Sequence, residues 1–142
     1  MEKGLLSLIL IVQFGIKKMN NPKYRCWHKI EKRFVDLRYI DFENETIGYD
    51  SQGEFNRYEK ERFENVVFQQ FTGLKDESGN KIYEGDILYA SYHQLKSEVV
   101  YDKRYCFFKL AASNSLSFYV DRSSFFEIMG NIFENKELLK ES

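Results

Sequence analysis

From Tyr24 onward, turn-forming residues divide the chain into short apolar–polar alternations, with hardly any long helical apolar pattern. Alternation with a period of two places apolar side chains on one face of a strand. Gly, Asn, Asp and Ser, which favour tight turns, separate these stretches. Aromatic residues form 17% of the sequence, which also favours strands because rings pack well on a pleated surface. The sequence therefore predicts a mainly β, antiparallel, barrel-like fold that is SH3-like in part.

The alternation also predicts where the strands lie. On the strand expected over 34–40, Val35, Leu37 and Tyr39 would share a face. Residues 48–53 are expected to form a loop, and residues 55–65 fit either a helix or a short strand. Asn135 could cap a short C-terminal helix near residues 135–140. The remaining strands are expected over residues 24–29, 66–71, 87–90, 98–101, 105–110, 116–120 and 125–132, and the apolar pattern restarts at Ile82-Tyr83.

The first eighteen residues differ in composition from the rest. Leu5 to Ile16 is almost continuously apolar, with Lys3 before it and Lys17-Lys18 after it. A helix needs about twenty apolar residues to span a bilayer, and no small-residue cleavage site follows. We interpret residues 1–18 as an extension outside the domain, with Met19 as the native start, and residues 19–142 as a single domain. A membrane-contacting segment and a cleaved signal stay open as alternatives.

Deleting residues 1–18 tests this interpretation. If the extension packs poorly on the domain, the melting temperature should stay nearly unchanged, as differential scanning calorimetry would measure. A loss of several degrees would show that Leu5 to Ile16 completes the core. Recovery of the full-length protein in the membrane fraction would support the anchoring alternative.

Charge and cysteine content constrain the partner and the compartment. Lys and Arg total 21 and Asp and Glu total 22, and the two signs alternate along the chain. Nucleic-acid-binding proteins usually show a basic excess or stripe, so such binding is the less favoured hypothesis. It would use a basic set of Lys75, Lys81, Lys103 and Arg104. The only two cysteines, Cys26 and Cys106, lie among apolar or aromatic neighbours, which indicates a reducing cytoplasm.

Several patterns approach known chemical sites without matching them. Cys26, His28, His93 and Cys106 lack the close pairs of a structural zinc site. Asp76, Ser78 and Asn80 resemble a calcium loop, but Lys81 and Ile87 occupy positions that require glycine and glutamate. Neither Gly73-Leu74-Lys75 nor Gly79-Asn80-Lys81 has the Gly-Lys-Ser/Thr of a phosphate loop. Asp41, Glu43 and Glu45 fall at strand spacing, where a solvated face explains them better than acid–base catalysis. We therefore expect neither an enzyme nor a cofactor.

Three ordered motifs resemble the YopX-like family of phage and prophage proteins. The first is Lys23-Tyr24-Arg25-Cys26-Trp27, followed by His28 where the family often has aspartate. The second runs from Gln70-Phe71-Thr72-Gly73-Leu74-Lys75-Asp76 through Gly79 to Ile82-Tyr83-Glu84-Gly85-Asp86-Ile87. The third runs from Ile128 to Leu139, with Lys136 where the family often has proline.

The resemblance implies a mostly β domain encoded by phages or prophages, without an established activity to transfer. We expect a non-catalytic accessory protein in the cytoplasm of the bacterial host that binds a protein partner or itself, with nucleic acid as the alternative. Gly79 and Gly85 are expected to serve tight turns, not a ligand. An aromatic partner surface could include Tyr83, Tyr89, Tyr92, Tyr101, Tyr105 and Tyr119.

Overall fold

A computed structural model of the chain describes residues 23–52, 57–91, 93–112 and 126–140. The prediction of a mainly β, antiparallel fold is confirmed, since the strand pairs of the described residues are all antiparallel. The strands are β1 (Tyr24–His28), β2 (Arg33–Val35), β3 (Leu37–Asp41), β4 (Thr46–Asp50), β5 (Tyr58–Arg62), β6 (Val66–Lys75), β7 (Lys81–Tyr83), β8 (Asp86–Ala90), β9 (Leu95–Asp102), β10 (Phe107–Leu110) and β11 (Phe126–Asn131).

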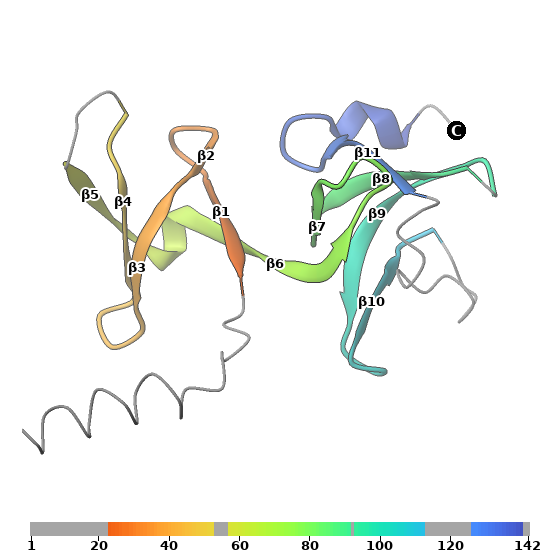
Figure 1. Cartoon of the computed structure of the whole chain (residues 1–142). Helices are drawn as coiled ribbons and strands as arrows, with labels where there is room; N and C mark the ends of the chain where they lie inside the picture. Colours follow the sequence, from red (N-terminus) through yellow and green to blue (C-terminus); the bar gives the residue numbers. More distant parts are fainter. Residues whose placement is uncertain (1–22, 53–56, 92, 113–125, 141–142) are drawn as a thin grey trace, which may run out of the picture.

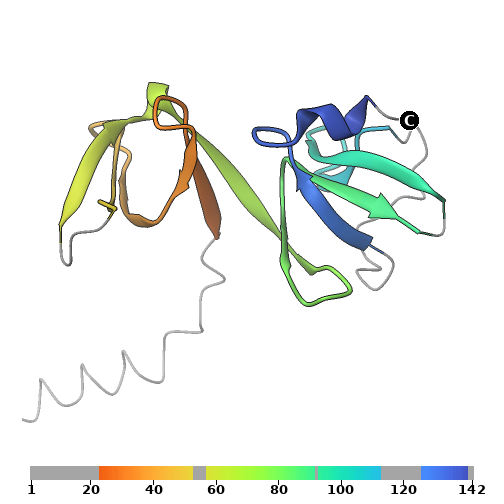
Figure 2. The same ribbon diagram turned by 90° about the horizontal axis from the view of Figure 1, so that it is seen from above.

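The strands form two lobes joined by β6 (Figures 1 and 2). The N lobe contains β1 to β5 and the first half of β6. The C lobe contains the second half of β6 and the strands after it. One four-stranded sheet, ordered β2-β1-β6-β7, extends across both lobes. The three-stranded sheet β3-β4-β5 completes the N lobe, and the curled four-stranded sheet β10-β9-β8-β11 completes the C lobe.

β6 belongs to both lobes because its halves pair with different strands. Residues from Val66 to Gln70 pair with β1, whereas Phe71 and Lys75 pair with Tyr83 and Lys81 of β7. The sequence predicted a strand over residues 66–71 that ends before Thr72-Gly73, and that end was wrong. The strand continues to Lys75, and its pairing register shifts between Phe71 and Lys75. Gly73 has a φ of +90°, which a glycine adopts easily, so the strand bends there instead of ending.

Each lobe has its own hydrophobic core. In the N lobe, apolar side chains of β1, β2, β4 and β6 meet at Cys26, Val35, Ile47, Tyr49 and Val66. In the C lobe, β7 to β11 contribute Ile82, Leu88, Ala90, Val99, Leu110 and Phe126. Burial of apolar area stabilises each cluster by about 25 cal/mol for each Å² removed from water. Additional contacts are therefore needed to fix one lobe against the other.

Arg25 provides a polar contact between the lobes. Its guanidinium donates to the buried carboxylate of Asp86 at 2.5 Å and to the side-chain oxygen of Gln69 at 2.8 Å. The same group lies 4.4 Å from the ring centroid of Phe34 and 4.8 Å from that of Tyr83. Cation–π contacts and paired charges are strongest where water is excluded. Arg25 therefore joins β1 to the first residue of β8.

An aromatic contact lies beside this ion pair. The rings of Trp27 and Phe133 stack with centroids 4.8 Å apart, and Phe34 packs edge-on against Trp27 at 5.0 Å. Asp86 also accepts the Tyr83 N–H at 2.8 Å, and Gly85 accepts the Ile132 N–H at 2.9 Å. The three motifs that resemble the YopX-like family thus meet where the lobes join. The contacts described for them hold the two lobes together.

The expected C-terminal helix is a single 3-10 turn, Lys136–Leu139. Asn135 precedes this turn but makes no capping hydrogen bond to it. Its side-chain oxygen instead accepts the Asn131 N–H at 3.2 Å, and Asn131 in turn accepts the N–H groups of Phe133 and Glu134. The turn after β11 therefore uses the side chain that was expected to start the helix.

Other differences lie in the N lobe. The strand expected over 34–40 is divided at Asp36 into β2 and β3. Gly48, Tyr49 and Asp50, expected in a loop, belong to β4, whose buried Ile47 and Tyr49 alternate with outward residues. Within the ambiguous stretch 55–65, Tyr58–Arg62 is a strand and Phe63–Asn65 a 3-10 turn. Residues 1–18 and the strand expected over 116–120 lie outside the described residues.

Candidate functional site

A β-bulge in β3 directs Tyr39 to the outer face of the three-stranded sheet, the face away from the N-lobe core. Leu37 pairs with Tyr49, but the register then shifts by one residue, so that Tyr39 pairs with Gly48. Leu37 consequently packs toward the N-lobe core with Tyr49, whereas Tyr39 points to the opposite side. The sequence prediction that Val35, Leu37 and Tyr39 share a face was therefore wrong for Tyr39.

The ring of Tyr39 lies on the backbone of Gly48. A Cβ added to Gly48 would lie 2.2, 2.6 and 2.7 Å from three adjacent ring carbons. The nearest carbon is Cε1, and its two ring neighbours, Cζ and Cδ1, are only about 0.5 Å farther from the added Cβ. An approach from the edge of the ring would leave these neighbours much farther away, so the face of the ring lies over the glycine. The absence of a side chain at Gly48 therefore allows Tyr39 to lie on the sheet with its other face toward solvent.

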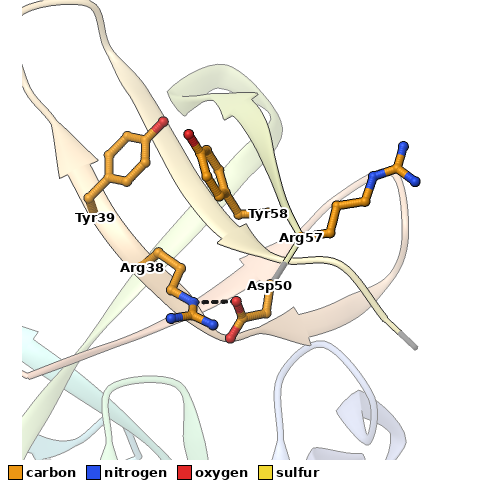
Figure 3. A pocket seen from close by; sticks show the side chains of 5 residues that line it. All are labelled: Arg38, Tyr39, Asp50, Arg57 and Tyr58. Atoms are coloured by element: carbon orange, nitrogen blue, oxygen red, sulfur yellow. Dashed lines mark hydrogen bonds and ion pairs between the residues drawn. The ribbon is translucent and has the colours of Figure 1, made fainter. Parts of the chain in front are cut away.

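Tyr39 forms one wall of a pocket of about 310 Å³ on this face (Figure 3). Tyr58 forms the facing wall, with ring centroids 6.1 Å apart and an edge-to-face angle of 77°. Arg38, the extra residue of the bulge, forms an ion pair with Asp50 at the base, and Arg57 completes the lining. Tyr39 is 37% exposed and Tyr58 57% exposed, so both rings are accessible. Tyrosine and arginine are enriched at protein interfaces, which fits this lining.

On the inner face of β5, carboxylates contact the polar groups of Tyr49 and His28. The Tyr49 hydroxyl donates to Glu31 at 2.6 Å, and burial together with this hydrogen bond raises the pKa of Tyr49. Buried His28 accepts the Glu31 N–H on Nδ1, and its Nε2 lies 3.2 Å from the Glu61 carboxylate. The hydrogen bond that the Asn65 side-chain amide donates to Glu61 is the main cause that lowers the pKa of Glu61. The bond to Nδ1 assigns the imidazole proton to Nε2, which faces Glu61.

The structure divides the basic set that the sequence suggested for nucleic acid. Lys75 and Lys81 are cross-strand partners at the end of the β6–β7 hairpin. Lys103 and Arg104 lie instead in the turn between β9 and β10. Arg104 donates to Asp102, and hydrogen bonds from Lys109 and Arg104 hold the pKa of Asp102 well below its usual range. Part of this basic charge is therefore neutralised locally.

The expected aromatic surface differs from the one observed. Tyr101 and Tyr105 are exposed on the β9–β10 hairpin, but Tyr83 is half-buried against Arg25, and Tyr89 is half-buried in β8. Tyr92 and Tyr119 lie outside the described residues. Sequence reasoning missed Tyr39 and Tyr58 as a pair, because a bulge leaves no reliable mark in an alternating pattern. The Gly48-Tyr49 dipeptide was the available signal, since a strand glycine often marks a close approach.

The residues considered for metal binding lie apart. Cys26 is in the N-lobe core, where burial raises the pKa of its thiol to about 12, whereas Cys106 is exposed in the β9–β10 turn. Asp76 accepts the N–H groups of Ser78 and Asn80, as a turn-organising carboxylate does. Among the described residues, no group of three or more His, Cys, Asp or Glu side chains is arranged to hold a metal ion.

The proposed row of Asp41, Glu43 and Glu45 does not form, because only Asp41 is in a strand. Glu43 and Glu45 lie in the turn between β3 and β4. The Asp41 carboxylate accepts the N–H groups of Glu43 and Asn44, and its hydrogen bonds with Asn44 are the main cause that lowers its pKa. Asp41 therefore organises this turn.

Comparison with known proteins places the whole described region in one family. The sequence profile of the YopX protein family matches residues 23–140. The chain belongs to the YopX family. This YopX protein is similar to a solved structure, the protein EF1440 from Enterococcus faecalis, with 30% sequence identity and a TM-score of 0.58. The match covers 83% of this chain and 97% of that one. The search of curated proteins found no match.

Over the described part of the YopX chain, no helix has the length and apolar character needed to cross a lipid bilayer.

Proposed function

We propose that this YopX-family protein is a non-catalytic phage or prophage accessory protein that binds a protein partner in the host cytoplasm. The observation that carries the proposal is the pocket between Tyr39 and Tyr58 on the outer face of the β3-β4-β5 sheet. Its lining combines two accessible rings with Arg38, Arg57 and one carboxylate. A mixed aromatic and charged lining of this kind suits a protein partner better than a uniformly basic face would.

The charge distribution and the C lobe support further parts of the proposal. Arg38 pairs with Asp50 and Arg104 with Asp102, so acidic side chains lie beside these cations. We include in the proposal that the C lobe is SH3-like, because the Glu84–Asp86 turn leads directly into its curled sheet. The buried thiol of Cys26 is compatible with a reducing cytoplasm.

Replacing Tyr58 with alanine is expected to weaken partner binding by about thirtyfold or more, the effect of removing a hot-spot residue from an interface. Gly48→Ala should act similarly, because the new methyl group would displace the ring of Tyr39. Quantitative affinity purification from host cells carrying the phage would measure the partner recovered with each variant. Tyr105→Ala removes a comparably exposed ring, 54% accessible, from the other lobe and is the matched control.

A partner that still binds Tyr58→Ala and Gly48→Ala as it binds the wild type would contradict the proposed surface. The nucleic-acid alternative is tested by fluorescence anisotropy with a labelled single-stranded DNA and an RNA duplex. Tight binding that falls steeply with salt, and that is lost when Lys75, Lys81, Lys103 and Arg104 are replaced, would favour nucleic acid.

A further inference from the structure

We propose that the partner segment at this surface is an extended strand that pairs with the edge of β5, which no strand of the described residues occupies, and that it alternates acidic with basic residues. This inference rests on the proposed function, since it specifies what the outer face binds. β5 is the last strand in the order β3-β4-β5, and it lies at the outer side of the N lobe (Figure 1). Addition of a strand to a sheet edge is a common mode of peptide recognition.

The hydrogen bonds of β5 to β4 establish which backbone groups face the edge. Ser51 donates to the carbonyl of Arg57, and Phe63 donates to the carbonyl of Glu45. In an antiparallel pair, alternate residues direct both backbone groups toward the partner strand. The residues between them, Tyr58, Lys60 and Arg62, therefore direct their N–H and C=O groups away from β4. The Arg62 N–H is bonded to the Glu61 side chain at 2.8 Å, which leaves Tyr58 and Lys60 as the binding positions.

The side chains of these edge residues also lie on the outer face. Tyr58 lines the first pocket, and Lys60 and Arg62 line a second pocket of about 450 Å³ with Thr46, Glu61, Glu64 and Asn65. Arg62 also lies 3.9 Å from the Glu64 carboxylate, and both of these side chains are exposed. A strand added to β5 would place residues opposite Lys60 and Arg62 on the same face, where acidic side chains would complement them. A residue beside Tyr58 would enter the first pocket, where an apolar or aromatic side chain fits.

The inner face of β5 carries the opposite charge. Glu59 and Glu61 alternate with the outer residues, and Glu59 is exposed. Residues of the added strand opposite these carboxylates would therefore be basic. The resulting pattern, with acidic residues on one face and basic residues on the other, is the complement of Tyr58-Glu59-Lys60-Glu61-Arg62.

A second copy of β5 fits this edge poorly. Only the even-numbered residues of β5 direct their backbone groups to the edge, so they must face one another in an antiparallel pair of two copies. The registers that pair at least three residues of each β5 are then centred on Glu59, Lys60 or Glu61. The first and last registers place a glutamate opposite its own copy. The middle register places Lys60 opposite Lys60, and Glu59 opposite Glu61. Like charges directly opposite destabilise a sheet, so the edge favours a different chain over itself.

The test is selection of a displayed library of random nonapeptides on the immobilised full-length protein, followed by synthesis of the enriched peptide. We expect acidic residues at alternate positions with basic residues between them. N-methylation of peptide residues whose N–H faces β5 should abolish binding, whereas N-methylation of the residues between them should have little effect. These peptides probe the wild-type protein, so no variant needs to fold.

Protein variants then separate backbone pairing from charge. Lys60→Pro removes one edge N–H and is compatible with an edge strand, because that N–H does not bond to β4. It should weaken binding by about tenfold, against about threefold for Lys60→Ala, which removes only the charge. Circular dichroism would confirm that both variants are folded.

The outcomes distinguish the two proposals. If Tyr58→Ala weakens binding but neither N-methylation nor Lys60→Pro does, strand addition is overturned and the proposed surface stands. If Tyr58→Ala has no effect on the enriched peptides, the proposed surface itself is wrong. The proposal of an alternating acidic and basic strand would be overturned by enrichment of proline-rich or uniformly basic peptides, or by a library without enrichment. It would also be overturned by a dimer in sedimentation that Lys60→Pro dissociates.

Discussion

Replacing Arg25 with alanine is expected to lower the free energy of unfolding by about 3–5 kcal/mol, the usual cost of leaving a buried charge without its partner. The Asp86 carboxylate is only 1% exposed and would lose its 2.5 Å ion pair, while Gln69, Phe34 and Tyr83 would lose contacts to the guanidinium. Urea denaturation followed by circular dichroism would measure the loss. Trp27 fluorescence would report the junction separately, since Trp27 is the one tryptophan in the sequence and stacks on Phe133.

Arg38→Ala is the matched control, because it removes another arginine–aspartate pair from an exposed position. Arg38 is 54% exposed and Asp50 39% exposed, so the cost should stay below about 1 kcal/mol. Equal losses for the two variants would show that Arg25 and Asp86 do not stabilise the junction. Coincident transitions by circular dichroism and fluorescence would also support the prediction that residues 19–142 form a single domain.

The cost of Arg25→Ala should decrease as the pH falls. Burial raises the pKa of Asp86 above its ordinary value of 3.8, although the charge of Arg25 opposes the shift. Because the folded protein binds the Asp86 proton more tightly than the unfolded chain does, protonation of Asp86 stabilises the fold. This stabilisation is fully present below pH 3.8, the ordinary pKa, and is lost as the pH rises through the raised pKa of the folded protein. Without Arg25 the pKa would rise further, and protonation would remove the unpaired charge. If the difference in free energy of unfolding between Arg25→Ala and the wild type increased as the pH fell, this account would be contradicted.

Gly85→Ala is expected to cost about 2–4 kcal/mol, the sum of a left-handed backbone conformation and crowding. Gly85 has a φ of +79°, and its added Cβ would lie 1.9 Å from the side-chain nitrogen of Gln69. Gln69 is buried, and its oxygen accepts from Arg25, so it cannot move without disturbing the junction. Thermal unfolding of the purified variant would measure the effect.

Gly79→Ala is the control for the backbone contribution alone. Its φ is +85°, but no atom lies within 4 Å of the added Cβ, so the cost should be about 1 kcal/mol. The folded fraction of both variants should bind the partner normally, since these turns lie outside the Tyr39–Tyr58 pocket. A Gly85 variant as stable as the parent that fails to bind would place the ligand on the turn instead.

The local pattern was sufficient to predict most strands and turns. Alternation around Val99 depends only on neighbouring residues and a buried face, and the turn at Gly79 depends on turn-forming residues. Around Cys26 and Ile87, by contrast, successive residues are buried and burial does not alternate. The resemblance to the YopX family rested on motifs that the structure brings together at the junction. These residues carry recognisable patterns because their contacts require particular side chains.

The candidate site was not predictable in the same way. The bulge after Leu37 changes the direction of Tyr39 through pairing with β4, and a single strand's sequence does not encode its partner's register. Tyr58 belonged to a stretch that fitted helix or strand equally well. The 3-10 turn at Lys136 replaced the expected helix because the Asn135 side chain bonds to Asn131, a contact that depends on tertiary geometry.

The sharing of β6 between both cores has a consequence for the order of folding during translation. As the chain leaves the ribosome, β1 can pair with β2 early, but it obtains its second partner, β6, only when residues 66–70 emerge. The next five residues are then fixed at one end, while Leu74 still lacks the C-lobe side chains against which it packs. The Asp76–Asn80 turn directly follows, so β7 can return at once and cover this strand. The nascent C lobe is thus assembled on a strand that the completed N lobe already holds in place.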